Sequence, residues 1–160
     1  MNFDSGIIFD PNVLTEEEKN YLDYKITKYT GPVDADGCEK FTPKTRAGKN
    51  ETIGSLSLDK DISLKYYQMK QKKLNPAALA LSLDSNLPIY KSMECSHLCG
   101  FGLCMNSSHI RFEPKNINND RIICHKNKLC GGHQSENNEY HYDACIIKTV
   151  KAVYAFENSL

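Results

Sequence analysis

The sequence from residue 95 to residue 145 reads CSHLCGFGLCMNSSHIRFEPKNINNDRIICHKNKLCGGHQSENNEYHYDAC. It holds six of the seven cysteines and all five histidines of the chain. Thiol and imidazole groups at such short spacing are typical of zinc sites. Because the stretch is otherwise poor in apolar residues, the pattern predicts a module that bound metal ions hold together.

The whole chain has 160 residues, about the size of one domain, and a formal net charge of zero. We therefore expect one domain over residues 1–160, with a zinc-binding core at residues 95–145. Short strands and helices are expected around the ligands, and we therefore expect a small α+β fold with antiparallel strands, stapled by zinc. Neutral net charge gives no general support for a polyanionic partner.

The first residues of the chain bear on the cellular compartment of the protein. Residues 1–10 contain two aspartates and no positively charged segment ahead of a long apolar run. We expect neither a secretory signal nor a membrane span, and hence a soluble, intracellular protein, nuclear if the host is eukaryotic. In a reducing compartment, thiols at short spacing with histidines are more often metal ligands than disulfides, and an odd number of cysteines cannot pair completely.

A first zinc site is indicated by the pattern Cys99-x4-Cys104-x4-His109, which supplies three ligands. The fourth must come from elsewhere in the chain. Cys38 is the best candidate because it is the one cysteine outside the cluster, and Cys95 is the alternative.

A second four-ligand site is indicated by Cys124-x5-Cys130-x2-His133 with Cys145 downstream. His141 is the alternative to His133, because on a helix His141 and Cys145 would share one face. We favour His133, since it closes a tight Cys-Gly-Gly-His turn. Residues 134–140 read as an insertion between the ligands.

The elements around these sites follow from capping residues and periodicity. Thr15 and the three glutamates after it predict a helix running to about Thr30. Asn75 and Pro76 predict another, ending near Asp84. We expect a strand over residues 89–93 that delivers His97, a second over 109–113, and a helix that opens at Pro114.

Closed zinc sites do not account for a histidine and an asparagine interleaved among the ligands. The order of these residues resembles the His-Cys box homing endonucleases, members of the ββα-metal, or His-Me finger, nucleases. The resemblance lies in Ser96-His97-Leu98-Cys99, Cys104, Asn106, His109, Glu113, Asn118, Arg121 and Cys124.

The resemblance implies a catalytic assignment. His97 would be the general base that takes a proton from water attacking a DNA phosphodiester, with its other ring nitrogen held by a backbone carbonyl. An unperturbed histidine pKa of about 6.5 suits that role near neutral pH. Asn118 would bind one catalytic Mg²⁺, and Arg46 would lie beside the scissile phosphate by its position upstream of the motif.

The resemblance also implies double-stranded DNA as partner, no membrane, and a homodimer that cuts both strands. The apolar-rich tail over residues 146–156 could form the dimer contact or pack on its own core. Two other functions fit the composition: a non-catalytic, zinc-stabilised nucleic-acid-binding module, and a zinc-organised protein-interaction domain. The chain has few arginines for a long DNA-reading surface, namely Arg46, Arg111 and Arg121.

Overall fold

The computed structural model describes residues 6–42, 56–57 and 73–147. These residues form a small α+β fold with short antiparallel strands, as predicted. The strands pair in twos: β1 (Ile7–Phe9) with β6 (Ile89–Tyr90), β2 (Thr30–Val33) with β3 (Glu39–Phe41), β4 (Leu56–Ser57) with β5 (Lys73–Leu74), β7 (Glu94–His97) with β8 (Ile110–Glu113), and β9 (His133–Gln134) with β10 (His141–Tyr142). None of the described helices is long and apolar enough to cross a bilayer.

Two helices begin where their capping residues predict. Helix α1 (Glu16–Lys28) follows Thr15, whose hydroxyl accepts a hydrogen bond from the backbone N–H of Glu18 at 3.2 Å. It ends slightly earlier than predicted, because Thr30 already belongs to β2. Helix α3 (Pro76–Ser85) follows Asn75, whose side chain accepts from the backbone N–H groups of Ala77 and Ala78.

The strand predicted over residues 89–93 is wrong in its extent. Only Ile89 and Tyr90 form a strand, β6, which pairs with β1 at the start of the chain. A turn follows, in which the backbone N–H of Met93 donates to the Tyr90 carbonyl at 3.1 Å. His97 is therefore carried by a separate strand, β7, which pairs with β8.

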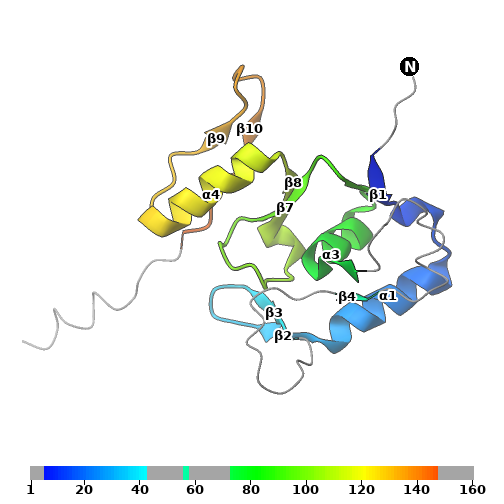
Figure 1. Ribbon diagram of the computed structural model, residues 1–160. Helices are drawn as coiled ribbons and strands as arrows, with labels where there is room; N and C mark the ends of the chain where they lie inside the picture. The colour runs from blue at the N-terminus through cyan, green and yellow to red at the C-terminus, as the bar shows by residue number, and fades with distance from the viewer. Residues whose placement is uncertain (1–5, 43–55, 58–72, 148–160) are drawn as a thin grey trace, which may run out of the picture.

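The β7–β8 hairpin separates two environments. Figure 1 shows α4 (Lys115–Asn127) and the β9–β10 hairpin on one side of it, and α1 and α3 on the other. Directly opposed residues share a face of an antiparallel pair. The pairs on the α4 side are polar, Glu94 with Glu113 and Ser96 with Arg111; those on the other side are Cys95 with Phe112 and His97 with Ile110.

An ordinary hydrophobic core fills the side away from α4. Its largest members, all nearly inaccessible to solvent, are Phe9, Leu22, Phe41, Leu79 and Ile110. On α4 itself, Ile117 is the buried apolar residue, and the other buried side chain is charged. The α4 side is therefore held by polar contacts and by the cysteine and histidine side chains described next.

Candidate metal centres and active site

The first cluster contains Cys38, Cys99, Cys104 and His109, whose ligand atoms all lie within 4.8 Å of one another. Nδ1 of His109 lies 3.6 Å from Sγ of Cys38 and 3.7 Å from Sγ of Cys104. In a tetrahedral zinc site, bonds of about 2.3 Å to sulfur and about 2.05 Å to nitrogen set the two atoms about 3.6 Å apart. The set of donor atoms and the distances between them therefore fit a zinc ion.

The turn between β2 and β3 brings Cys38 to this cluster. A side-chain oxygen of Asp34 accepts from the backbone N–H of Cys38 at 2.9 Å, which closes the turn. Gly37 has a φ of +79°, and a Cβ there would lie 3.3 Å from Cε1 of His109. Its carbonyl accepts from Nδ2 of Asn106 at 2.7 Å. A left-handed glycine thus lets the backbone pass close to the His109 ring.

Cys95, the alternative ligand, does not belong to the cluster. It lies on the core face of β7, where burial raises the pKa of its thiol to about 12. Within the cluster, by contrast, the pKa of the Cys104 thiol is lowered to about 4, chiefly because Cys99 donates a hydrogen bond to the sulfur of Cys104. The thiolate is the form that binds zinc.

The second cluster contains Cys124, Cys130, His133 and Cys145, again with ligand atoms within 4.8 Å of one another. Nε2 of His133 lies 3.8, 3.3 and 3.2 Å from the sulfurs of Cys124, Cys130 and Cys145, respectively. This donor set also fits zinc, although its distances scatter more widely around the tetrahedral value. Burial opposes ionisation of Cys130, but backbone N–H groups of Cys145 and Gly132 lower its pKa.

The apparent insertion between the ligands is the β9–β10 hairpin. The backbone N–H of Ser135 donates to the Tyr140 carbonyl at 2.9 Å, which closes the turn. His133 is buried on β9, whereas His141 is exposed on β10. The hairpin returns the chain so that Cys145 reaches the cluster, and His141 lies outside it.

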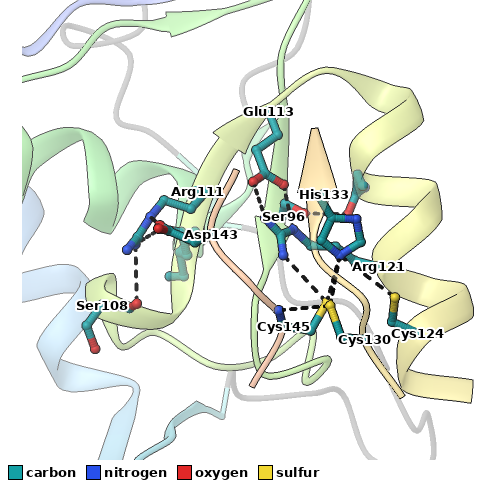
Figure 2. A network of polar contacts seen from close by, with 12 residues as sticks. Ser96, Ser108, Arg111, Glu113, Arg121, Cys124, Cys130, His133, Asp143 and Cys145 are labelled. Atoms are coloured by element: carbon teal, nitrogen blue, oxygen red, sulfur yellow. Dashed lines mark hydrogen bonds and ion pairs between the residues drawn. The ribbon is translucent and has the colours of Figure 1, made fainter. Parts of the chain in front are cut away.

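Arg121 connects this cluster to the β7–β8 hairpin (Figure 2). Its guanidinium donates to both carboxylate oxygens of Glu113 and, from a third nitrogen, to Sγ of Cys145 at 3.5 Å. Burial alone would lower the pKa of Arg121, but these two partners hold it above its usual value. A zinc ion with three thiolate ligands would carry a net negative charge, which an arginine at Cys145 would offset.

His97 lies at the end of β7, with Nε2 3.1 Å from the carbonyl oxygen of Cys104. This is the kind of backbone contact that the resemblance implied. Because a carbonyl can only accept, Nε2 carries the proton, and the lone pair of the neutral ring is on Nδ1. Burial lowers the pKa of His97, which favours that neutral form, although the Cys104 carbonyl partly opposes the shift.

Asn118 lies near the start of α4 and faces β7. Its Oδ1 accepts from the hydroxyl of Ser96 at 2.9 Å, and its Nδ2 donates to a carboxylate oxygen of Glu94 at 2.6 Å. Ser96 directly precedes His97, so a single hydrogen bond connects the amide to the strand position next to the histidine. Sequence reasoning missed Glu94, because it is not part of the motif and its spacing from Asn118 carries no signal.

Two further predictions cannot be placed. Arg46 lies outside the described residues, and so does the tail over residues 146–156 apart from its first two residues.

Comparison with known proteins points to the same part of the chain as the two clusters. A family model described as the zinc-binding loop region of homing endonuclease matches residues 44–156. The match includes both His97 and Asn118 and every member of the two clusters except Cys38. No curated protein and no solved structure matches the chain.

Proposed function

This chain belongs to the family of the zinc-binding loop region of homing endonuclease, and we propose that it is a metal-dependent DNA endonuclease. Family membership supports a nuclease-like function with DNA as substrate. The assignment of the catalytic residues rests on the packing of α4 against β7. It supplies a histidine whose neutral ring is oriented by a backbone carbonyl, and an amide that is hydrogen-bonded to Ser96, the residue before that histidine. The same region holds two clusters that could bind zinc.

In the proposed reaction His97 is the general base. Its Nδ1 takes a proton from the water that attacks the phosphorus atom, while Nε2 stays bound to the Cys104 carbonyl and keeps the ring in place. Zinc bound to the first cluster would hold the backbone around this carbonyl in place, because Cys104 is also a member of that cluster. That cluster therefore orients the base without taking part in the chemistry.

Asn118 is the proposed protein ligand of one Mg²⁺, through Oδ1. Magnesium prefers oxygen ligands and keeps several waters, so one amide oxygen together with phosphate oxygens fits its chemistry. When bound, the ion supplies charge stabilisation at the phosphate and at the departing 3′ oxygen. A neutral amide ligand is suited to this task because it leaves the positive charge of the ion undiminished.

The two clusters are proposed as structural zinc sites. Each offers four protein ligands, which would complete the tetrahedral coordination of a zinc ion and leave no open position for substrate. The proposed ligands are Cys38, Cys99, Cys104 and His109 in one site, and Cys124, Cys130, His133 and Cys145 in the other.

Supercoiled plasmid with Mg²⁺ tests the proposal. The zinc-loaded protein should convert the plasmid to nicked and linear forms, and His97→Ala should slow this by about 100-fold or more, as expected for loss of a general base. His141→Ala, which removes an exposed histidine, is the matched control and should cut at the normal rate. Equal cutting by the His97 variant would contradict the assignment.

The role of Asn118 needs its own variant. Asn118→Ala should weaken the Mg²⁺-dependent rate and leave the zinc content unchanged, because the residue belongs to neither cluster. If the variant loses zinc, Asn118 is a structural residue. If no form of the protein cuts, a salt titration of DNA binding separates a nucleic-acid-binding module, whose affinity falls steeply with salt, from a protein-interaction domain.

We further propose a homodimer acting on duplex DNA. Each chain offers one active site, and a two-fold dimer places two such sites on opposite strands. Such a substrate implies an intracellular protein, nuclear in a eukaryotic host. Sedimentation at working concentration should find a dimer, and a monomer with full double-strand cutting would contradict the proposal.

A further inference from the structure

Both polar atoms of the Asn118 side chain have partners on β7. The hydroxyl of Ser96 donates to Oδ1 at 2.9 Å, and Nδ2 donates to Oε2 of Glu94 at 2.6 Å. Residues 94 and 96 lie on the face of the strand that α4 covers. We propose that Glu94 is a positioning residue that fixes the orientation of the Asn118 amide, and this rests on the proposed role of Asn118 as the magnesium ligand.

Glu94 is the partner that determines which way the amide points. A hydroxyl can donate or accept, so Ser96 would tolerate either end of the amide. An ionised carboxylate can only accept, so Glu94 requires the NH₂ group of Asn118. With the amide turned over, Oδ1 would lie against a carboxylate oxygen and be repelled. Glu94 therefore directs Oδ1 away from itself, toward Ser96.

Strand stability gives no reason for a carboxylate at this position. Glu94 lies directly opposite Glu113 in the β7–β8 register, and like charges at opposed positions destabilise a pair of strands. Glu113 is already engaged with Arg121. Within the described part of the chain, the ion pairs do not include Glu94, and its side-chain hydrogen bond is the one to Asn118.

The contact would also improve Oδ1 as a ligand. A hydrogen bond from an amide NH₂ to a carboxylate is charge-assisted and draws electron density toward the amide oxygen. An oriented, more negative oxygen binds a hard cation better. Loss of such an outer partner of a metal ligand typically costs 10- to 100-fold in metal affinity or activity.

The test compares Glu94→Ala and Glu94→Gln with Glu136→Gln, an exposed charge-matched control in the β9–β10 turn. In plasmid nicking, Glu94→Ala should lose about 10- to 100-fold in rate at limiting Mg²⁺. Glu94→Gln should lose less, because its carbonyl can still accept from Asn118, and Glu136→Gln should match the parent. In an Asn118→Ala background, Glu94→Ala should cost nothing further, since Glu94 acts through Asn118.

A second readout does not depend on cutting. The side-chain NH₂ resonances of Asn118 in an amide NMR spectrum of the zinc-loaded protein should move in Glu94→Ala and stay in place in Glu136→Gln. Unchanged resonances together with a normal Mg²⁺ dependence would overturn the proposal. A loss of zinc or a loss of rate that persists in the Asn118→Ala background would also overturn it, because Glu94 would then act on the scaffold.

The two readouts keep this inference separate from the proposed function. If the parent protein cuts and Asn118→Ala does not, the function stands whatever Glu94 does. If the parent does not cut at all, the proposed function fails, and the NMR comparison alone decides whether Glu94 holds the amide.

Discussion

Arg121 of α4 donates two hydrogen bonds, at 2.8 and 2.5 Å, to Glu113 of β8, and both side chains are almost fully buried. Asn118 and Cys124 lie three residues before and three residues after Arg121, nearly one helical turn in each direction. This ion pair joins α4 to the hairpin that carries His97, together with the hydrogen bonds from Asn118 to β7. It couples the second cluster to the proposed active site.

Breaking this pair should be costly. In Arg121→Met the Glu113 carboxylate is left buried without its partner, which should lower the free energy of unfolding by about 3–5 kcal/mol. The double variant Arg121→Met with Glu113→Leu should recover most of that loss, since an apolar pair of similar volume is tolerated. Urea unfolding of the zinc-loaded protein measures both changes.

Arg111 provides the matched control, because its ion pair with Asp143 is exposed. Arg111→Met should lower the free energy of unfolding by no more than about 1 kcal/mol. If the two single variants cost the same, the buried pair does not have the structural role assigned to it.

The fourth ligand of the first cluster can be identified by zinc content. Cys38→Ala should lose about one zinc ion per chain, because it leaves only three ligands in that cluster. Cys95→Ala should retain the full content, since Cys95 packs on the core face of β7. Elemental analysis of both purified variants distinguishes the two cysteines, and the reverse pattern would assign the ligand to Cys95.

The same comparison applies to the histidines of the second cluster. His133→Ala removes a nitrogen that lies 3.2 Å from Sγ of Cys145, and it should release about one zinc ion per chain. His141→Ala alters an exposed side chain of β10 and should keep the zinc content of the parent. A colorimetric chelator titration reads out the release. Zinc loss in the His141 variant alone would contradict the cluster as described.

Gly100 is predicted to tolerate no side chain. Its φ is +69°, and a Cβ there would lie 2.5 Å from Cγ of His125 on α4, so the ring would have to move. Left-handed strain and overpacking together should cost Gly100→Ala about 2–4 kcal/mol in unfolding free energy. Gly102→Ala, with open space around its Cβ position, is the control and should change stability little. Similar melting temperatures for the two variants would contradict this packing.

Much of the candidate site could be predicted because ligand chemistry is local in sequence. Cys99, Cys104 and His109 come together across one short loop, and the tight turn after Cys130 favours His133 over His141. Cys38 could be inferred only because one cysteine stands apart from the rest. Capping chemistry is equally local, and both Thr15 and Asn75 cap the helices that they predict.

What the sequence does not predict depends on pairing between distant residues. The strand boundary near Tyr90 follows from the pairing of β6 with β1, about 80 residues earlier. The contact between Glu94 and Asn118 requires the docking of α4 on β7, which no spacing rule encodes. The burial of Arg121 is also not predicted by its residue type, because arginine is mostly found at the surface.

Elemental analysis of the folded protein tests the zinc scaffold most directly. Purified, monodisperse protein with native unfolding cooperativity should contain two zinc ions per chain, one for each cluster, and should lose its fold when a strong chelator removes them. Folded protein that is essentially free of zinc would contradict the scaffold, and with it the placement of His97 and Asn118 for catalysis.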